Sequence, residues 1–185
     1  MSYLFKKPGV ITLAVMLLVV VLGVLYLTFR DQSILQKRNS TPAATALLPD
    51  KEDAQFTDLQ GQPVSLAPEF GQVIVVFSWA SWCPSCTSEF GRLAEIAQFY
   101  KDREVVVLAV NRGEDKYSAE RFLATITPPQ EIQFILDPND FYFSNSSGYA
   151  MPETIIYAKN GEILTHQRGE VRQDELKQAI DKGLE

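Results

Sequence analysis

Residues 55–185 alternate between short apolar runs and longer amphipathic stretches. In three of the stretches apolar residues recur at helical spacing, which predicts helices over residues 84–100, 117–126 and 174–182. Short runs rich in β-branched residues predict buried strands over residues 73–77, 104–110 and 132–136. Strands that alternate with helices in this order indicate an α/β domain.

Two further segments predict pairs of strands that follow each other directly. Residues 55–66, QFTDLQGQPVSL, have the pattern of two short strands joined by a glycine turn. Residues 154–158 and 162–167 flank Lys159-Asn160-Gly161 as a hairpin would, and Asn-Gly favours a tight primed turn. Residues 137–148 are rich in turn-forming residues. The predicted fold class is α/β, with a mixed central sheet flanked by helices.

The N-terminal part of the chain follows a different pattern. No charged residue occurs from residue 8 to residue 29, and nearly all residues from Val10 onward are apolar. These 22 residues are enough to cross a bilayer, which needs about 20 residues in a helix. A cleaved signal peptide would have a shorter apolar core followed closely by a cleavage site, whereas Arg30 and Asp31 follow here. We therefore expect a cytoplasmic tail over residues 1–7 and an uncleaved transmembrane signal anchor over residues 8–29, in preference to a buried soluble helix.

Residues 30–54 are rich in small and polar residues and have no sustained periodicity. We interpret them as a linker between the anchor and a folded domain over residues 55–185. Positive charges lie on both sides of the span, so the charge rule does not settle its orientation.

Composition supports a folded domain and argues against one class of partner. The chain is 46% hydrophobic and has a net charge of −6. Residues 51–185 contain 12 Lys and Arg against 21 Asp and Glu, which leaves this part at −9. A nucleic-acid-binding protein would present a basic face, so we expect no nucleic-acid partner.

Both cysteines lie in WASWCPSC, residues 79–86, where a predicted strand ends and a predicted helix begins. Helix N-termini stabilise thiolate anions, so Cys83 is placed to act as a nucleophile. Pro84 suits the first helical position, because its missing N–H would have no partner there. Cys86 follows at a spacing that allows the pair to close and reopen a disulfide. We expect a solvent-facing exchange site in which Cys83 attacks and Cys86 resolves.

The cysteines have two alternative interpretations, half of a zinc site and a purely structural disulfide. Half of a zinc site would need two more ligands, but the chain has no other cysteine and one histidine, His166, in a predicted strand. We interpret His166 as an ordinary strand residue. A purely structural disulfide would close too short a loop to stabilise the fold much. We therefore expect no bound metal and no cofactor.

Several segments together resemble a known family. They are QFTDLQGQPVSL at 55–66, VIVVFSWASWCPSC at 73–86, AVNRGE at 109–114, ILD at 135–137 and MPETIIYAKNGEI at 151–163. Over residues 55–185 the chain resembles the thioredoxin superfamily, specifically the membrane-anchored TlpA-like thiol-disulfide oxidoreductases, including those of cytochrome c maturation. The resemblance implies a thioredoxin-like fold, and it implies that the domain works on the periplasmic or extracytoplasmic side of the cytoplasmic membrane.

The resemblance also implies roles for individual residues. Pro152 matches the cis-proline that lies against the disulfide in this family, and Met151 before it would touch the cysteines; an ordinary trans-proline is the alternative. Glu114 matches an acid that would raise the thiol pKa values and accept a proton from Cys86; a solvated loop acid is the alternative. The candidate catalytic residues are Cys83, Cys86 and Glu114, and the candidate substrate-binding residues are Trp82, Pro84, Met151 and Pro152.

Two positions depart from the family pattern. The family commonly has a basic residue after the second cysteine and threonine after the cis-proline, whereas Thr87 and Glu153 stand at these positions. The carboxylate of Glu153 adds negative charge beside the site, which bears on the choice of partner.

The leading hypothesis is an enzyme that exchanges disulfides with extracytoplasmic client proteins, and we favour a reductant role in cytochrome c maturation. A membrane electron-donor thiol protein would re-reduce it. The alternative is a tethered module that uses the same cysteines to deliver copper or assist assembly, although related copper carriers have a wider CxxxC spacing. Replacing Cys86 with serine separates the two hypotheses.

Overall fold

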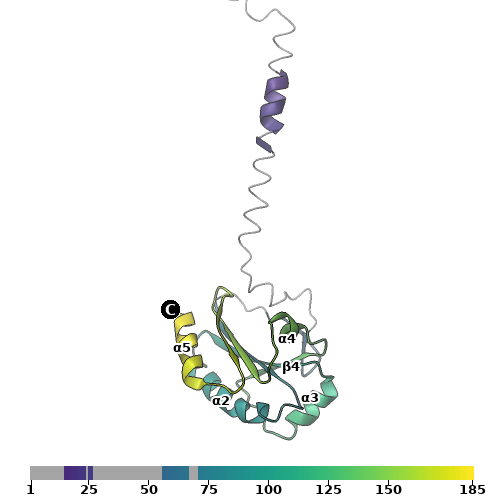
Figure 1. Ribbon diagram of the computed structural model, residues 1–185, viewed down its shortest axis with the longest axis vertical. Helices are drawn as coiled ribbons and strands as arrows, with labels where there is room; N and C mark the ends of the chain where they lie inside the picture. The colour runs from purple at the N-terminus through teal and green to yellow at the C-terminus, as the bar shows by residue number, and fades with distance from the viewer. Residues whose placement is uncertain (1–14, 24, 27–55, 67–70) are drawn as a thin grey trace, which may run out of the picture. The chain divides into compact units, whose positions relative to one another are not determined.

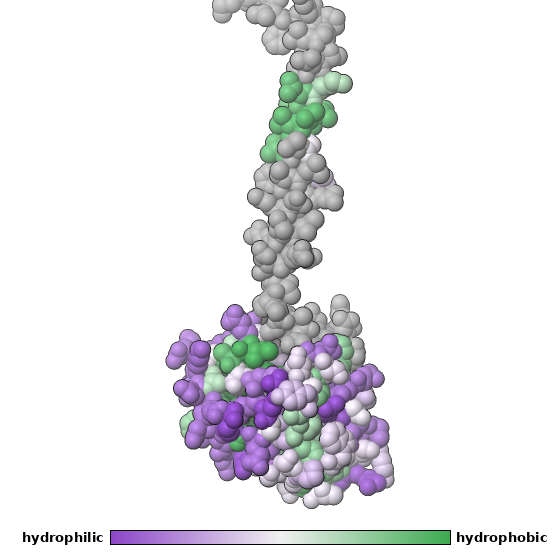
Figure 2. All heavy atoms as spheres, viewed as in Figure 1, coloured by the Kyte–Doolittle hydropathy of each residue, from purple (hydrophilic) through white to green (hydrophobic). Residues whose placement is uncertain are grey.

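The computed structural model describes residues 15–23, 25–26, 56–66 and 71–185 (Figure 1). The chain divides into two units, residues 1–41 and 42–185, and each is considered by itself. In the first unit, residues 15–23 and 25–26 are helical, and Figure 2 shows their surface as largely apolar. Within the described ranges no helix is long and apolar enough to span a bilayer. The tail, the linker and much of the expected span over residues 8–29 lie outside these ranges, so the anchor stays a prediction.

The strands of the second unit form one mixed sheet in the order β2-β1-β5-β4-β3-β6-β7. Strands β3 and β4 and strands β4 and β5 pair in parallel, and all other pairs are antiparallel. All residues of β3 are buried, as expected for a central strand covered on both faces. The mixed sheet predicted from the sequence is thus confirmed. The strands are β1 (Phe56–Asp58), β2 (Pro63–Val64), β3 (Val73–Trp79), β4 (Val105–Arg112), β5 (Gln133–Asp137), β6 (Glu153–Tyr157) and β7 (Ile163–Arg168).

Helices cover both faces of the sheet (Figure 1). Because side chains alternate along a strand, Val75, Phe77 and Trp79 of β3 pack into one apolar cluster and Ile74 and Val76 into another. The first cluster, which we call the disulfide face, contains both cysteines and is covered by α2 (Cys86–Phe99), α3 (Lys116–Leu123) and α5 (Gln173–Leu184). The opposite face is covered by the short helix α4 (Phe141–Asn145).

Two local predictions were wrong. The turn-rich segment at residues 137–148 contains the helix α4, which begins where both carboxylate oxygens of Asp137 accept N–H groups from Phe141 and Tyr142, at 3.0 and 2.7 Å. In the β6–β7 hairpin the Gly161 N–H donates to the Ala158 carbonyl at 2.8 Å, which makes Lys159 and Asn160 the central residues of the turn. Neither has a positive φ, whereas a primed turn requires one at the first central residue, so the turn is not of the primed type.

Candidate active site

Cys83 and Cys86 are joined in a disulfide between the end of β3 and the start of α2. Their Cα atoms lie 5.4 Å apart. A tight turn connects strand and helix, because the Cys83 N–H donates to the Ala80 carbonyl at 3.1 Å and the Cys86 N–H donates to the Cys83 carbonyl at 3.2 Å. The structure therefore shows the oxidised form of the predicted pair.

The disulfide is less exposed than a solvent-facing site, so this expectation was wrong in degree. Cys83 is 3% exposed and Cys86 0%, because both pack into the apolar cluster of the disulfide face. Pro84 is exposed but lies in the turn rather than at the first helical position, since α2 begins at Cys86. Ser85 precedes the helix with nearly helical dihedral angles, and its side chain does not cap the first-turn amides. Of the two cysteines, Cys83 therefore keeps the larger exposed fraction.

The residues Met151 and Pro152 lead into β6. The Met151-Pro152 peptide bond is cis, as the resemblance implied. Met151 is partly buried and packs against the apolar cluster that contains both cysteines. The structure thus brings two segments about 70 residues apart in sequence to one site, the CxxC turn and the cis-proline segment.

Glu114 is tied to the loop that carries the cysteines. It follows the end of β4, and its Oε2 accepts the Ser81 N–H at 2.8 Å and an Asn111 Nδ2–H at 2.7 Å. The Ser81 hydroxyl donates to the other carboxylate oxygen. Ser81 lies two residues before Cys83, so Glu114 is a fixed part of the site rather than a freely solvated loop acid. The sequence did not identify Ser81 or Asn111 as its partners.

Glu153 lies at the other side of the cis-proline and is 1% exposed. Its Oε1 is 2.6 Å from Nε2 of His166 and 3.0 Å from Nε of Arg168. Both partners belong to β7, which pairs with β6 so that Glu153 faces Arg168 directly. His166 is therefore more than an ordinary strand residue, because it bonds a buried carboxylate one residue from the cis-proline.

A third acid at the site was missed in the sequence. Glu89 is 0% exposed and lies one helical turn beyond Cys86 in α2. Its two oxygens accept the Val171 N–H at 3.0 Å and Nη1 of Arg92 at 2.8 Å. The available signal was its position, since it falls three residues after Cys86 and four before Leu93 on the apolar stripe of the helix.

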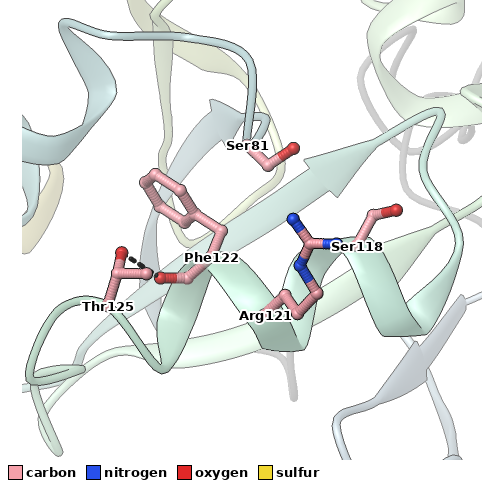
Figure 3. A pocket seen from close by; sticks show the side chains of 5 residues that line it. All are labelled: Ser81, Ser118, Arg121, Phe122 and Thr125. Carbon is pink, nitrogen blue, oxygen red and sulfur yellow. Dashed lines mark hydrogen bonds between the residues drawn. The ribbon is translucent and has the colours of Figure 1, made fainter.

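A hollow of about 320 Å³ opens beside Ser81. Figure 3 shows side chains of Ser81, on the loop before Cys83, and of residues on and just after α3 around it. The Thr125 hydroxyl donates to the Phe122 carbonyl at 2.7 Å, and the ring of Phe122 packs on Trp79 with centroids 5.4 Å apart. The hollow thus adjoins the loop held by Glu114. Its lining residues are Ser81, Ser118, Arg121, Phe122 and Thr125.

Sequence relatives agree with this geometry. The thiol-disulfide oxidoreductase ResA of Geobacillus kaustophilus is 26% identical over 176 residues, which cover 95% of this chain and 97% of the relative. The thiol:disulfide interchange protein DsbE of Allochromatium vinosum is 32% identical over 127 residues, which cover 69% of this chain and 64% of the relative.

Solved structures agree as well. A crystal structure of a Chlorobium tepidum protein assigned as a thiol:disulfide interchange protein DsbE is 27% identical, with a TM-score of 0.63 over 70% of this chain and 92% of that one. The exposed lipoprotein thioredoxin Etrx1 of Streptococcus pneumoniae is 19% identical with a TM-score of 0.61, over 69% of this chain and 96% of that one, which shows the same fold. The family model described as Redoxin matches residues 37–181. The chain belongs to the redoxin family and is a thiol-disulfide oxidoreductase with a thioredoxin-like fold.

Proposed function

We propose that the protein is a membrane-anchored reductant of disulfides in extracytoplasmic client proteins, acting in cytochrome c maturation. The observation that carries the exchange chemistry is the Cys83–Cys86 disulfide in an apolar cluster against which Met151, the residue before the cis-proline, also packs. The apolar run at residues 8–29 supports the anchor, and an anchored domain of this kind would work on the outer side of the cytoplasmic membrane.

The reaction begins from the dithiol form. The Cys83 thiolate attacks one sulfur of the client disulfide, and the other client sulfur leaves as a thiolate that takes up a proton. Cys86 then loses its proton and attacks Cys83 in the mixed disulfide, which releases the second client thiol. The client gains two electrons and two protons, and the protein is left with the Cys83–Cys86 disulfide present in the structure. A membrane electron-donor thiol protein would return it to the dithiol.

The candidate residues divide the remaining work. Glu114 would accept the Cys86 proton, since its carboxylate is held against the loop that ends at Cys83. Trp82, which is 59% exposed, and Pro84 would contact the client on the CxxC side. Met151 and Pro152 would contact it on the opposite side, where an extended segment can pair with the backbone.

The decisive experiment replaces the resolving cysteine in the full chain. With Cys86→Ser, a disulfide-bonded client should be trapped as a mixed disulfide with Cys83, visible as a reducible higher-mass band. Cys83→Ser is the matched control and should trap nothing. Loss of bound copper in Cys86→Ser without any trapped client would instead favour the metal-delivery alternative. In the described part of the chain no three His, Cys, Asp or Glu side chains are grouped to hold a metal ion.

The direction of electron flow has its own test. The reduction potential of the full chain in detergent, measured against glutathione, should lie near that of thioredoxin, at about −270 mV. A potential near about −120 mV, that of a strong periplasmic oxidant, would reverse the proposed direction while leaving the exchange chemistry intact.

A further inference from the structure

Tyr149 is a large exposed side chain at the edge of the exchange site. It is 78% exposed, more than Trp82 at 59%, and it lies two residues before Met151. An exposed aromatic ring leaves a large apolar area in water unless a partner covers it, and tyrosine is enriched at protein–protein interfaces. Because Tyr149 lies in the segment that leads to the cis-proline, it is placed to contact a client bound at the disulfide.

Arg168 holds this ring in place. The guanidinium carbon of Arg168 lies 4.6 Å from the centroid of the Tyr149 ring. One guanidinium nitrogen is 3.5 Å from the Ser147 carbonyl, and another bonds the buried carboxylate of Glu153 at 3.0 Å. Because the guanidinium is planar and bonded along its edge, its face is left for stacking. Tyr149 is therefore presented on a fixed support instead of rotating freely.

The segment before the cis-proline is also packed tightly against Glu153. A Cβ atom on Gly148 would lie 2.7 Å from Oε2 of Glu153 and 2.7 Å from the ring of Phe143. Only glycine permits this close approach. The backbone next to Tyr149 thus rests directly on the buried acid and on α4.

Trp82, on the cysteine side, has a similar support. The guanidinium carbon of Arg112 lies 3.6 Å from the Phe143 ring centroid and 5.9 Å from that of Trp82. Arg112 also makes a two-pronged ion pair with Asp140, at 3.0 and 2.5 Å. The Phe143 ring also lies next to Gly148, which precedes Tyr149. We call Trp82, Arg112, Phe143, Tyr149 and Arg168 the row.

The two arginines add almost no net charge to this row. Each guanidinium is paired with a carboxylate, Arg112 with Asp140 and Arg168 with Glu153. Unpaired arginines would favour acidic clients, but paired ones offer flat, charge-balanced surfaces for stacking. The chemistry that fits such a row is an aromatic or aliphatic side chain.

We propose that Tyr149, supported by Arg168, is a docking contact for the client and that the row selects clients with an aromatic or aliphatic residue next to the disulfide. The proposal rests on the proposed function, because the docked client is the disulfide substrate. Loss of one aromatic contact should weaken docking about three- to tenfold.

The test compares the reduction of three disulfide-bonded peptides by the full chain in detergent. The peptides differ only in the residue next to cysteine, which is Phe, Glu or Lys, and hydroxyethyl disulfide serves as a small uncharged substrate. Wild type should prefer the Phe peptide, equally at low and at high salt, because stacking is not screened by ions. Tyr149→Ala should raise KM for the Phe peptide about three- to tenfold, with kcat and the hydroxyethyl disulfide rate unchanged.

Tyr117→Ala is the matched control. Tyr117 is 68% exposed and also stacks with an arginine, Arg121 at 5.7 Å, but it belongs to α3 and not to the segment that leads to the cis-proline. It should leave all four substrates unaffected. Tyr149→Phe should retain the preference, and Arg168→Gln should weaken it by releasing the ring.

Four outcomes overturn the proposal. A preference for the Glu or Lys peptide would show that charge governs docking. Equal slowing of peptides and hydroxyethyl disulfide by Tyr149→Ala would show a general effect on the exchange chemistry. A wild type that reduces hydroxyethyl disulfide without any peptide preference refutes the docking contact alone, whereas a wild type inert to every disulfide refutes the proposed function and the docking contact with it.

Discussion

Glu114 and Glu153 are carboxylates on two sides of one exchange site, and their surroundings differ. Glu114 is partly exposed and is held by the neutral donors Ser81 and Asn111. Glu153 is 1% exposed and is held by His166 and Arg168, while its Oε2 is buried without a hydrogen-bond partner. Glu114 is held by neutral groups on and near the loop before Cys83. Glu153 is bonded by His166 and Arg168 of β7, and it directly follows the cis-proline.

The difference indicates a division of roles. A carboxylate held only by neutral groups can take up a proton without breaking an ion pair, so Glu114 suits the proposed proton transfer. An acid bonded to a guanidinium has its charge already compensated, so Glu153 suits positioning.

The largest effect is expected for Glu153→Leu. Removal of the carboxylate leaves His166 and Arg168 without their acceptor, which should lower the free energy of unfolding by about 3 kcal/mol. Arg168 is one-third exposed and can partly rehydrate, which keeps the loss at the lower end for buried pairs. Urea unfolding measures it, with Glu153→Gln as the comparison that retains one acceptor oxygen. A loss under 1 kcal/mol would contradict the positioning role.

Glu114→Gln should instead affect the reaction. We expect the resolving step to slow about a hundredfold, which equals about 2.7 kcal/mol in the barrier, with little change in stability. The glutamine oxygen can keep the bonds from Ser81 N–H and Asn111, and the Ser81 hydroxyl can rotate to accept from the new amide. Rapid-mixing kinetics of mixed-disulfide decay measures the step.

The control for this variant is Asp115→Asn, which removes the neighbouring charge. Hydrogen bonds from Ser118 lower the pKa of Asp115, and asparagine preserves the cap of α3. It should leave the rate unchanged. A rate for Glu114→Gln within threefold of wild type would mean that Glu114 only shapes the loop.

Gly148→Ala should have an intermediate effect on stability. The added methyl group meets Oε2 of Glu153 and the Phe143 ring at 2.7 Å, so the segment must move, at about 2 kcal/mol. Gly91→Ala in α2 is the matched control, because a Cβ there meets nothing within 4 Å, and it should stabilise the helix by about 0.5–1 kcal/mol. Thermal unfolding compares the Tm values of the two variants. Equal shifts in Tm would contradict tight packing of Gly148 on Glu153.

The last effect is absent at neutral pH and appears only in alkaline solution, from a tyrosine pair near Glu153. The hydroxyls of Tyr142 and Tyr157 are 2.9 Å apart in the opposite-face core. Burial raises the pKa of Tyr157 to about 12 and that of Tyr142 well above its ordinary value of 10.0, and the charge of Glu153 adds to the rise for Tyr142. A raised pKa favours the neutral form in the fold, so this stabilisation is complete below about pH 10 and is lost as pH rises through 12.

Absorbance against pH reports the ionisation of the tyrosines. The free energy of unfolding should fall by about 1.4 kcal/mol per pH unit for each tyrosine whose pKa is raised in the fold. Tyr157→Phe should remove part of the slope. Glu153→Gln should let Tyr142 ionise at lower pH, since one source of repulsion is gone. Ionisation of all tyrosines near pH 10 in the folded protein would contradict the buried pair.

Local patterns accounted for much of the fold. The apolar run at residues 73–77 and the apolar stripe through Phe90 and Leu93 each depend on one segment, so the sequence identifies them directly. The helix α4 was missed because its start depends on Asp137 capping the following turn, a signal weaker than periodicity. Glu89 was missed because an acid in an apolar stripe is stable only when a distant backbone group, here the Val171 N–H, meets it.

The sequence by itself determined the redox chemistry, because the CxxC spacing, the preceding strand and the following helix are neighbours along the chain. It also determined the apolar segment at residues 8–29, whose length is a property of one stretch. Only the tertiary structure decided which groups bond the acids Glu114 and Glu153. Strand pairing brings His166 and Arg168 to Glu153, and the ends of β3 and β4 bring Ser81 to Glu114. These contacts depend on strand register and burial, which arise only when distant segments pack together. The sequence shows each acid, but it does not show which distant residue will bond it.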